Sequence, residues 1–119
     1  MLYEANGITK IIVACGYTDL RRGIESLSAI IQKQYKMDPY EKNVLFLFCG
    51  RRSDRIKGLL WEGNGFLLLY KRLEGGSFSW PRTPEEAVSI SKNEFRLLMK
   101  GLDPVHPRVY DIGRPTSSY

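Results

Sequence analysis

The sequence predicts an α/β domain of the α+β type: a mostly antiparallel, twisted sheet of about five strands with one long helix packed on it and a short C-terminal helix. Three observations support this fold class. Short apolar runs of strand length recur along the chain, one stretch carries apolar residues at helical spacing, and an Asn-Gly pair joins two alternating runs. At 119 residues the chain is long enough for one core, since a domain of this size buries roughly two-thirds of its unfolded surface.

The first half of the chain predicts a strand, a long helix and a second strand. Residues 10–14 (KIIVA) have the length and apolar character of a buried strand. Apolar residues then recur every three or four positions, which predicts an amphipathic helix over residues 19–35. Thr18 is a suitable N-cap, and Asp19 favours the first helical turn. Residues 44–48 (VLFLF) are apolar throughout, which is typical of a central strand covered on both faces.

A β-hairpin is predicted next. Residues 55–62 and 66–73 alternate in character around Asn64-Gly65, two residue types that both accept positive φ. With these two residues as the loop, position 61 pairs with 68 and position 57 with 72. One hairpin face then carries a set of aliphatic residues suited to a core, namely Ile56, Leu60, Leu67, Leu69 and Leu73.

Three short elements complete the predicted domain. Residues 77–80 are expected to form a strand after a Gly-Gly turn, and residues 87–90 one more. Ser91 and Glu94 have the spacing of a capping box, which predicts a short helix that ends at Gly101.

The lack of membrane-spanning and signal-peptide patterns, together with the placing of the cysteines, predicts a soluble, cytoplasmic protein. The domain is expected to cover residues 1–103, and the tail over residues 104–119, with its three prolines, to be extended or disordered. No apolar run approaches the roughly 20 residues that span a bilayer, and the N-terminus lacks a signal-peptide pattern. Cys15 and Cys49 each end an apolar run, where reduced thiols pack as small hydrophobes, although their spacing does not exclude a disulfide.

Positive charge is concentrated in one stretch. Between Arg51 and Arg72 six Lys and Arg stand against two Asp and Glu, so this stretch carries +4 of the net charge of +5. A localised basic patch suits a polyanion such as nucleic acid, because neutralised phosphates release counterions. A solvated edge kept soluble by its charges is an equally good interpretation of charge alone.

The second hairpin face combines cations with aromatic rings. It carries Lys57, Trp61, Tyr70 and Arg72 with two leucines between them. Ion pairing and stacking on such a face would serve phosphates and unstacked bases. Two alternatives stay open: the rings pack beneath the helix as core, or they form a surface for a protein partner.

Catalytic and metal chemistry lack the residues they need. The chain has two Cys and one His without zinc-ligand spacing, and His106, between prolines, is interpreted as a surface residue. No D/E-x-K pattern of a restriction-type nuclease occurs, and Gly63-Asn64-Gly65 lacks the Lys and Ser/Thr of a phosphate loop. We therefore predict a protein that is not an enzyme and has no cofactor.

Three segments carry a family resemblance. "ACGYTDLRRGIESL", "RRSDRIKGLLWEGNGFLLLYKRLEGGSFSWP" and "VSISKNEFRLLMKGLD" resemble the TnpB-type accessory protein of insertion sequences of the IS66 class, which is encoded beside the transposase. The resemblance implies a role in DNA transposition that is separate from the catalytic transposase. Gly58 is a departure, since the resemblance suggests a larger residue there.

The resemblance and the charge pattern together define the predicted site. The residues predicted to bind nucleic acid are Arg51, Arg52, Arg55, Lys57, Trp61, Tyr70, Lys71, Arg72, Arg21 and Arg22. Further motif positions with competing structural explanations are Thr18, Asp19, Asp54 and Asn64. The predicted partner is DNA, with the element-encoded transposase as a second partner. In the alternative function, the chain docks on the transposase without contacting DNA, and Trp61 and Tyr70 are the anchors.

Overall fold

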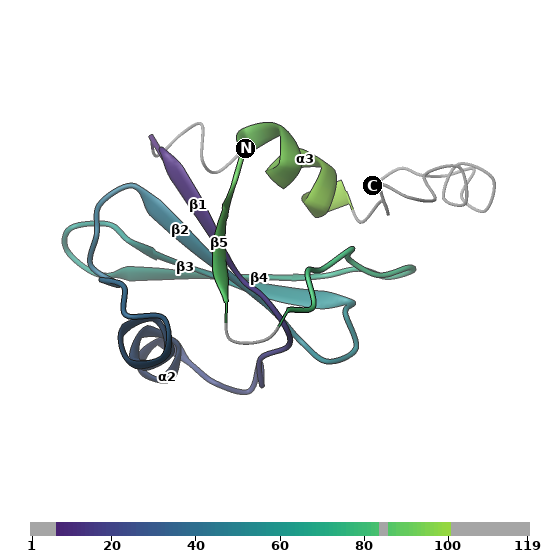
Figure 1. Cartoon of the computed structure of the whole chain (residues 1–119), viewed down its shortest axis with the longest axis horizontal. Helices are drawn as coiled ribbons and strands as arrows, with labels where there is room; N and C mark the ends of the chain where they lie inside the picture. The colour runs from purple at the N-terminus through teal and green to yellow at the C-terminus, as the bar shows by residue number, and fades with distance from the viewer. Residues whose placement is uncertain (1–6, 84–85, 101–119) are drawn as a thin grey trace.

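The computed structural model describes residues 7–83 and 86–100. Five strands form one sheet in the order β4-β3-β2-β1-β5 (Figure 1). Their bounds are β1 Lys10–Ala14, β2 Val44–Cys49, β3 Arg55–Trp61, β4 Phe66–Arg72 and β5 Ala87–Ile90. The first and last residues of these five strands differ by at most one position from those of five predicted strands.

The sheet is mixed, so the prediction of a mostly antiparallel sheet is wrong. β1 pairs with β2 in parallel, with Lys10 opposite Val44, while the other neighbouring pairs are antiparallel. Parallel neighbours need a long crossover, and the helical segment after β1 supplies it. As a result, the loops that follow β1 and β2 leave the sheet at the same edge.

The two faces of the sheet carry different helices. α2 (Ile24–Ala29) and the π-helical turn η1 (Ile30–Gln34) cover one face, and α3 (Lys92–Lys100) covers the other (Figure 1). The long helix predicted over residues 19–35 is therefore wrong at its start and in its type. In the wider turn of η1 both Ile30 and Ile31 contact the core.

The helix starts late because the preceding loop is held in an extended path. The Thr18 N–H donates to the Cys49 carbonyl oxygen at 2.8 Å, so Thr18 lies against the sheet and does not cap the helix. The backbone of Gly23, just before α2, is extended at φ −100° and ψ −163°. Backbone bonding to the end of β2 therefore takes precedence over the helical periodicity of this stretch.

Two apolar cores fill the space on either side of the sheet. All six residues of β2 are buried, which confirms the predicted central strand. Leu27 and Ile31 pack on one face, and Phe95 and Leu98 of α3 on the other. Cys15 and Cys49 are buried free thiols, as the sequence predicts for reduced cysteines.

The hairpin turn lies one residue earlier than predicted. Trp61 pairs with Phe66 and Leu59 with Leu68, so Gly63 and Asn64 are the two central turn residues. Gly63 has φ +93°, and glycine at the first central position is typical of a type II′ turn. Because a loop shift of one residue shifts the pairing by two, every side chain keeps its predicted face.

Residues 77–80 do not form the predicted strand. They serve as an anchored connection, because Phe78 and Trp80 are buried in the core on the α3 face. The Trp80 indole N–H donates to the Ala14 carbonyl oxygen at 2.9 Å. This bond ties the connection to the end of β1.

The capping box of α3 is confirmed. The Ser91 N–H donates to Glu94 Oε1 at 2.7 Å, and the Glu94 N–H donates to Ser91 Oγ at 3.0 Å. The predicted helix end at Gly101 and the tail over residues 104–119 lie outside the described residues. Among the helices that the structure describes, none has the length and apolar content needed to cross a bilayer.

Candidate functional site

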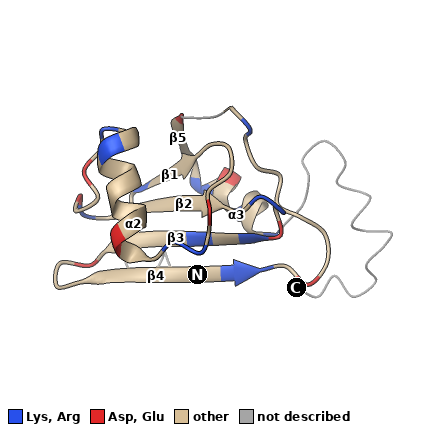
Figure 2. Ribbon diagram, turned by 90° about the horizontal axis from the view of Figure 1, so that it is seen from below, with Lys and Arg blue, Asp and Glu red and all other residues tan. Residues whose placement is uncertain are grey.

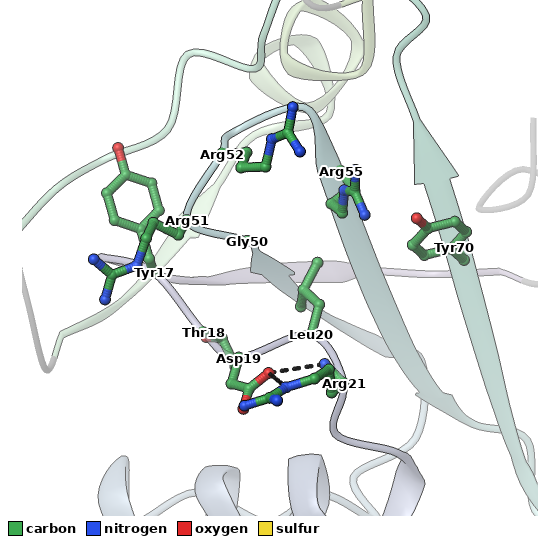
Figure 3. Close-up of a pocket in the computed structure, with 10 residues that line it drawn as sticks. All are labelled: Tyr17, Thr18, Asp19, Leu20, Arg21, Gly50, Arg51, Arg52, Arg55 and Tyr70. Atoms are coloured by element: carbon green, nitrogen blue, oxygen red, sulfur yellow. Dashed lines mark hydrogen bonds and ion pairs between the residues drawn. The ribbon is translucent and has the colours of Figure 1, made fainter.

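A pocket of about 500 Å³ lies where the loop after β1 meets the loop after β2. Its walls are residues 17–21, residues 50–52, Arg55 and Tyr70 (Figure 3). We call it the arginine pocket, since four of its side chains are guanidinium groups. It unites two segments that lie about 30 positions apart in the sequence.

Parallel pairing and one close contact bring these segments together. The carboxyl ends of β1 and β2 share an edge, and the bond from Thr18 to Cys49 fixes one loop against the other. Gly50 is buried where Leu20 and Arg55 approach: a Cβ built on it would lie 3.2 Å from Leu20 Cδ1 and 3.3 Å from Arg55 Cγ. The absence of a side chain at Gly50 therefore lets both neighbours reach the pocket.

The turn that carries Arg51 and Arg52 is bonded on both sides. The Gly50 N–H donates to the Arg55 carbonyl oxygen at 3.0 Å, and the Ser53 N–H to the Gly50 carbonyl oxygen at 2.9 Å. Ser53 has φ +61°, a conformation that non-glycine residues rarely adopt. Its carbonyl oxygen accepts a bond of 2.6 Å from the Phe78 N–H. The turn is thus fixed to the segment after β4, and the two arginines project from a defined backbone.

Two of the four arginines are already paired. Arg21 Nη2 lies 2.8 Å from Asp19 Oδ2, and Arg55 Nε lies 3.0 Å from Asp54 Oδ1. The bond from Arg21 holds the pKa of Asp19 well below its ordinary value, and the bond from Arg55 lowers the pKa of Asp54. Both carboxyl groups are therefore ionised at neutral pH and balance these two guanidinium charges. Asp54 braces the turn through Arg55.

Arg51 and Arg52 carry the unbalanced charge. Both are exposed, and within the described residues neither side chain forms an ion pair or a hydrogen bond. Figure 2 shows further basic positions at the start of β3 and at the tip of β4. The latter includes Arg72, which lies 3.5 Å from Glu74 and is not a wall of the pocket. This end of the sheet is consequently the one at which an anion meets free guanidinium donors.

Several predicted site residues lie elsewhere or have a structural bond. Lys57 Nζ donates to the Arg22 carbonyl oxygen at 3.0 Å, which braces the loop before α2, and the Arg22 side chain is exposed beside a second hollow. Lys71 points to the opposite face of the sheet, where its Nζ donates to the Met99 carbonyl oxygen at 2.7 Å. Asn64 is a central residue of the hairpin turn.

Trp61 is separated from the cations. It lies at the other end of β3 from Arg55, about 20 Å away by strand length, in an aromatic cluster with Tyr40 and Phe66. The Trp61 ring centroid is 5.0 Å from that of Tyr40 and 4.9 Å from that of Phe66. The cations and this indole therefore lie at opposite ends of one hairpin face.

Tyr17 is a pocket residue that was missing from the predicted site. Tyr17 is 43% exposed, and it lies on the opposite side of the pocket from Tyr70 (Figure 3). The available signal was its place directly after the first buried strand, since the ends of two parallel strands meet at one edge. Assigning β1 and β2 as parallel would have placed Tyr17 beside the arginines.

The described residues contain no group of three or more His, Cys, Asp or Glu side chains placed to hold a metal ion. The one carboxylate in the walls of the arginine pocket, that of Asp19, is paired with Arg21. What the pocket offers chemically is recognition of an anion with an adjoining planar group.

Comparisons with known proteins assign the chain to a family. Residues 9–109 match the family model described as IS66 Orf2 like protein. The Sinorhizobium fredii protein named "Uncharacterized protein y4jC" is 36% identical over 116 residues, which are 98% of this chain and 97% of that protein. "Uncharacterized protein y4hO" of the same organism is 36% identical over 107 residues, 90% of each chain. No solved structure gives a significant match.

The chain belongs to the IS66 Orf2-like family. This confirms the resemblance that the three sequence segments carry. Membership supports an accessory role in the transposition of an insertion sequence.

Proposed function

We propose that this protein is a non-catalytic accessory factor of transposition that binds DNA through the arginine pocket. The observation that carries the proposal is the pair Arg51 and Arg52, two exposed guanidinium groups that form no ion pair or hydrogen bond within the described residues, on a turn bonded at both ends. Guanidinium groups bind phosphate through paired hydrogen bonds. A turn that is already ordered loses little conformational entropy when it binds.

The carboxylates of the site support a binding role over a catalytic one. Asp19 and Asp54 are each bonded to an arginine of the same segment, so they are not free to hold a metal ion or to act as bases. Incubation of the purified protein with supercoiled plasmid and Mg²⁺ or Mn²⁺ should leave the plasmid uncut. Cleavage that disappears in Asp54→Ala would overturn the non-catalytic assignment.

A salt titration tests DNA binding directly. Fluorescence anisotropy with a labelled duplex should give an association constant whose logarithm falls linearly with the logarithm of salt concentration. In Arg51→Ala/Arg52→Ala, affinity should fall and the slope should decrease by about two, since each lost phosphate contact removes about one.

The matched control is Lys33→Ala/Lys42→Ala, which removes two exposed lysines outside the arginine pocket. It keeps the same net charge as the arginine variant. Equal losses in the two variants, or binding that is insensitive to salt, would contradict the proposed site.

A second candidate function is docking on the element-encoded transposase through the aromatic cluster. Tyr40 is 54% exposed although its ring lies against those of Trp61 and Phe66, at centroid distances of 5.0 and 5.2 Å. An exposed ring that packs against two other aromatic rings is suited to become a buried anchor at a protein interface. The cluster lies at the far end of the hairpin from the arginine pocket, so the two functions are separable by mutation.

Co-purification with the transposase of the same element tests this second function. Tyr40→Ala should abolish the complex. DNA affinity should stay within about twofold of wild type, because removal of the exposed Tyr40 ring leaves Trp61, Phe66 and the distant arginine pocket in place. Arg51→Ala/Arg52→Ala should retain the complex. Retention of the complex by Tyr40→Ala would exclude the cluster as the docking site.

A further inference from the structure

The arginine pocket is a concave site with aromatic walls. Tyr17 and Tyr70 stand at opposite sides of it, and Leu20 and Gly50 lie between them (Figure 3). Its volume of about 500 Å³ falls in the range of sites that enclose a small molecule. A surface built only to follow a phosphate backbone has no need of such a hollow.

The two tyrosine rings are open to a ligand. Tyr17 is 43% and Tyr70 55% exposed, and within the described residues neither ring packs against another aromatic side chain. They differ in this from Tyr40, an equally exposed ring that lies against two others. An exposed ring beside guanidinium groups is the arrangement on which an unstacked base binds.

The charge of the pocket is suited to a phosphate next to that base. Its walls hold four arginines and one aspartate, and Arg51 and Arg52 have free donors. Base and phosphate of one nucleotide would thus meet rings and guanidinium groups in the same hollow.

We propose that the arginine pocket takes one unpaired nucleotide of DNA, with its base against Tyr17 or Tyr70 and its phosphate on Arg51 or Arg52. This inference rests on the proposed function and adds a preference to it. In a fully paired duplex the bases are stacked inside the helix and cannot enter a pocket. The protein therefore binds a single strand, or the unpaired extension of a duplex, in preference to a blunt duplex.

Anisotropy with three labelled DNAs tests the preference: a blunt 20-base-pair duplex, the same duplex with a five-nucleotide single-stranded extension, and the single strand alone. At one salt concentration the extended duplex and the single strand should bind about tenfold more tightly than the blunt duplex, the scale of one stacked base. A single-stranded RNA of the same sequence serves as a further probe.

Tyrosine variants then distinguish the contribution of the rings to this preference from that of the charges. Tyr17→Leu/Tyr70→Leu should bind all three DNAs as wild type binds the blunt duplex, with circular dichroism as the check on folding. Tyr70→Phe should retain the preference, because the ring and not the hydroxyl carries it. Tyr40→Leu, which removes an equally exposed ring outside the pocket, should also retain it.

The outcomes distinguish this inference from the proposed function. Equal affinity for blunt and extended duplexes, with a loss in Arg51→Ala/Arg52→Ala, would overturn the nucleotide pocket and leave DNA binding intact. A preference that survives Tyr17→Leu/Tyr70→Leu, or tighter binding of RNA than of single-stranded DNA, would also overturn it. Failure to bind any of these DNAs at low salt would remove both proposals.

Discussion

Arg55 of β3 lies directly opposite Arg72 of β4, so two like charges face the same side of the sheet as cross-strand neighbours. Each has one acidic partner, Asp54 for Arg55 and Glu74 for Arg72. Like charges directly opposite each other destabilise an antiparallel pair. The pair therefore carries a repulsion in the folded protein that the two acidic partners offset only in part.

The first prediction concerns this pair. Arg72→Gln should raise the melting temperature at low salt and lower DNA affinity, because it removes repulsion in the free protein and a positive charge near the pocket. The stability gain should shrink as salt screens the charges. Lys33→Gln, which removes an exposed charge elsewhere, should change neither property appreciably. Unchanged or lower thermal stability of Arg72→Gln at low salt would contradict this account.

The second prediction concerns the close approach at Gly50. Gly50→Ala should reduce the free energy of unfolding by about 1 kcal/mol, because the new methyl group must displace Leu20 and Arg55. Since Arg55 forms a pocket wall, DNA affinity should fall as well. In Gly65→Ala the Cβ meets nothing within 4 Å, so that variant should stay within about 0.5 kcal/mol of wild type. Urea denaturation of the three proteins would reveal the difference.

The third prediction assigns Lys71 a structural role. Lys71→Met should lower the free energy of unfolding by about 1 kcal/mol, since it removes the bond to the Met99 carbonyl oxygen in the last turn of α3. Amide exchange in α3 should become faster while DNA affinity changes by less than about twofold. A large loss of DNA affinity without loss of stability would show instead that Lys71 contributes to the binding surface.

The fourth prediction uses the buried thiol at the end of β2. Burial raises the pKa of Cys49 to about 12, above the ordinary value of about 8.5 that the unfolded chain retains. A group whose pKa is raised by folding stabilises the protein fully below its unfolded pKa, and this contribution is lost as the pH rises to the folded pKa. The excess stability of wild type over Cys49→Ala should therefore shrink between pH 9 and pH 12.

Chemical denaturation of both proteins at pH 8 and pH 11 measures this difference. The alkaline titration of lysines and tyrosines is common to the two chains and cancels in the comparison. A wild-type advantage that is the same at both pH values would show that the Cys49 thiolate is tolerated in the folded state.

Local patterns predicted most of the strands and the start of α3, because these elements depend on neighbours in the sequence. Residues 44–48 are apolar at every position and lie at the centre of the sheet, and the capping box at Ser91 and Glu94 formed as expected. The hairpin faces were predicted correctly even though the turn was misplaced. Side chains alternate between the faces of a strand, so a register shift of two residues leaves each side chain on the same face.

What the sequence patterns missed depends on contacts between distant segments. The helical periodicity after Thr18 is real, yet a backbone bond to Cys49 competes with it and delays the helix to Ile24. The parallel direction of β1 and β2 has no signal in either strand alone. The charge pattern predicted Arg51, Arg52 and Arg55 as candidate site residues, whereas Tyr17 and the shape of the pocket depend on the parallel pairing and were not predicted.

The parallel pair has a consequence for the order of events during folding. Lys10 and Val44 must meet across a chain closure of 34 positions before the walls of the pocket exist, and such non-local closures slow folding. A nascent or truncated chain that ends before β2 therefore lacks the strand and the arginine-bearing turn that complete the pocket. In the finished protein, a ligand in the pocket would bind only the native state and so protect the whole fold against unfolding and proteolysis.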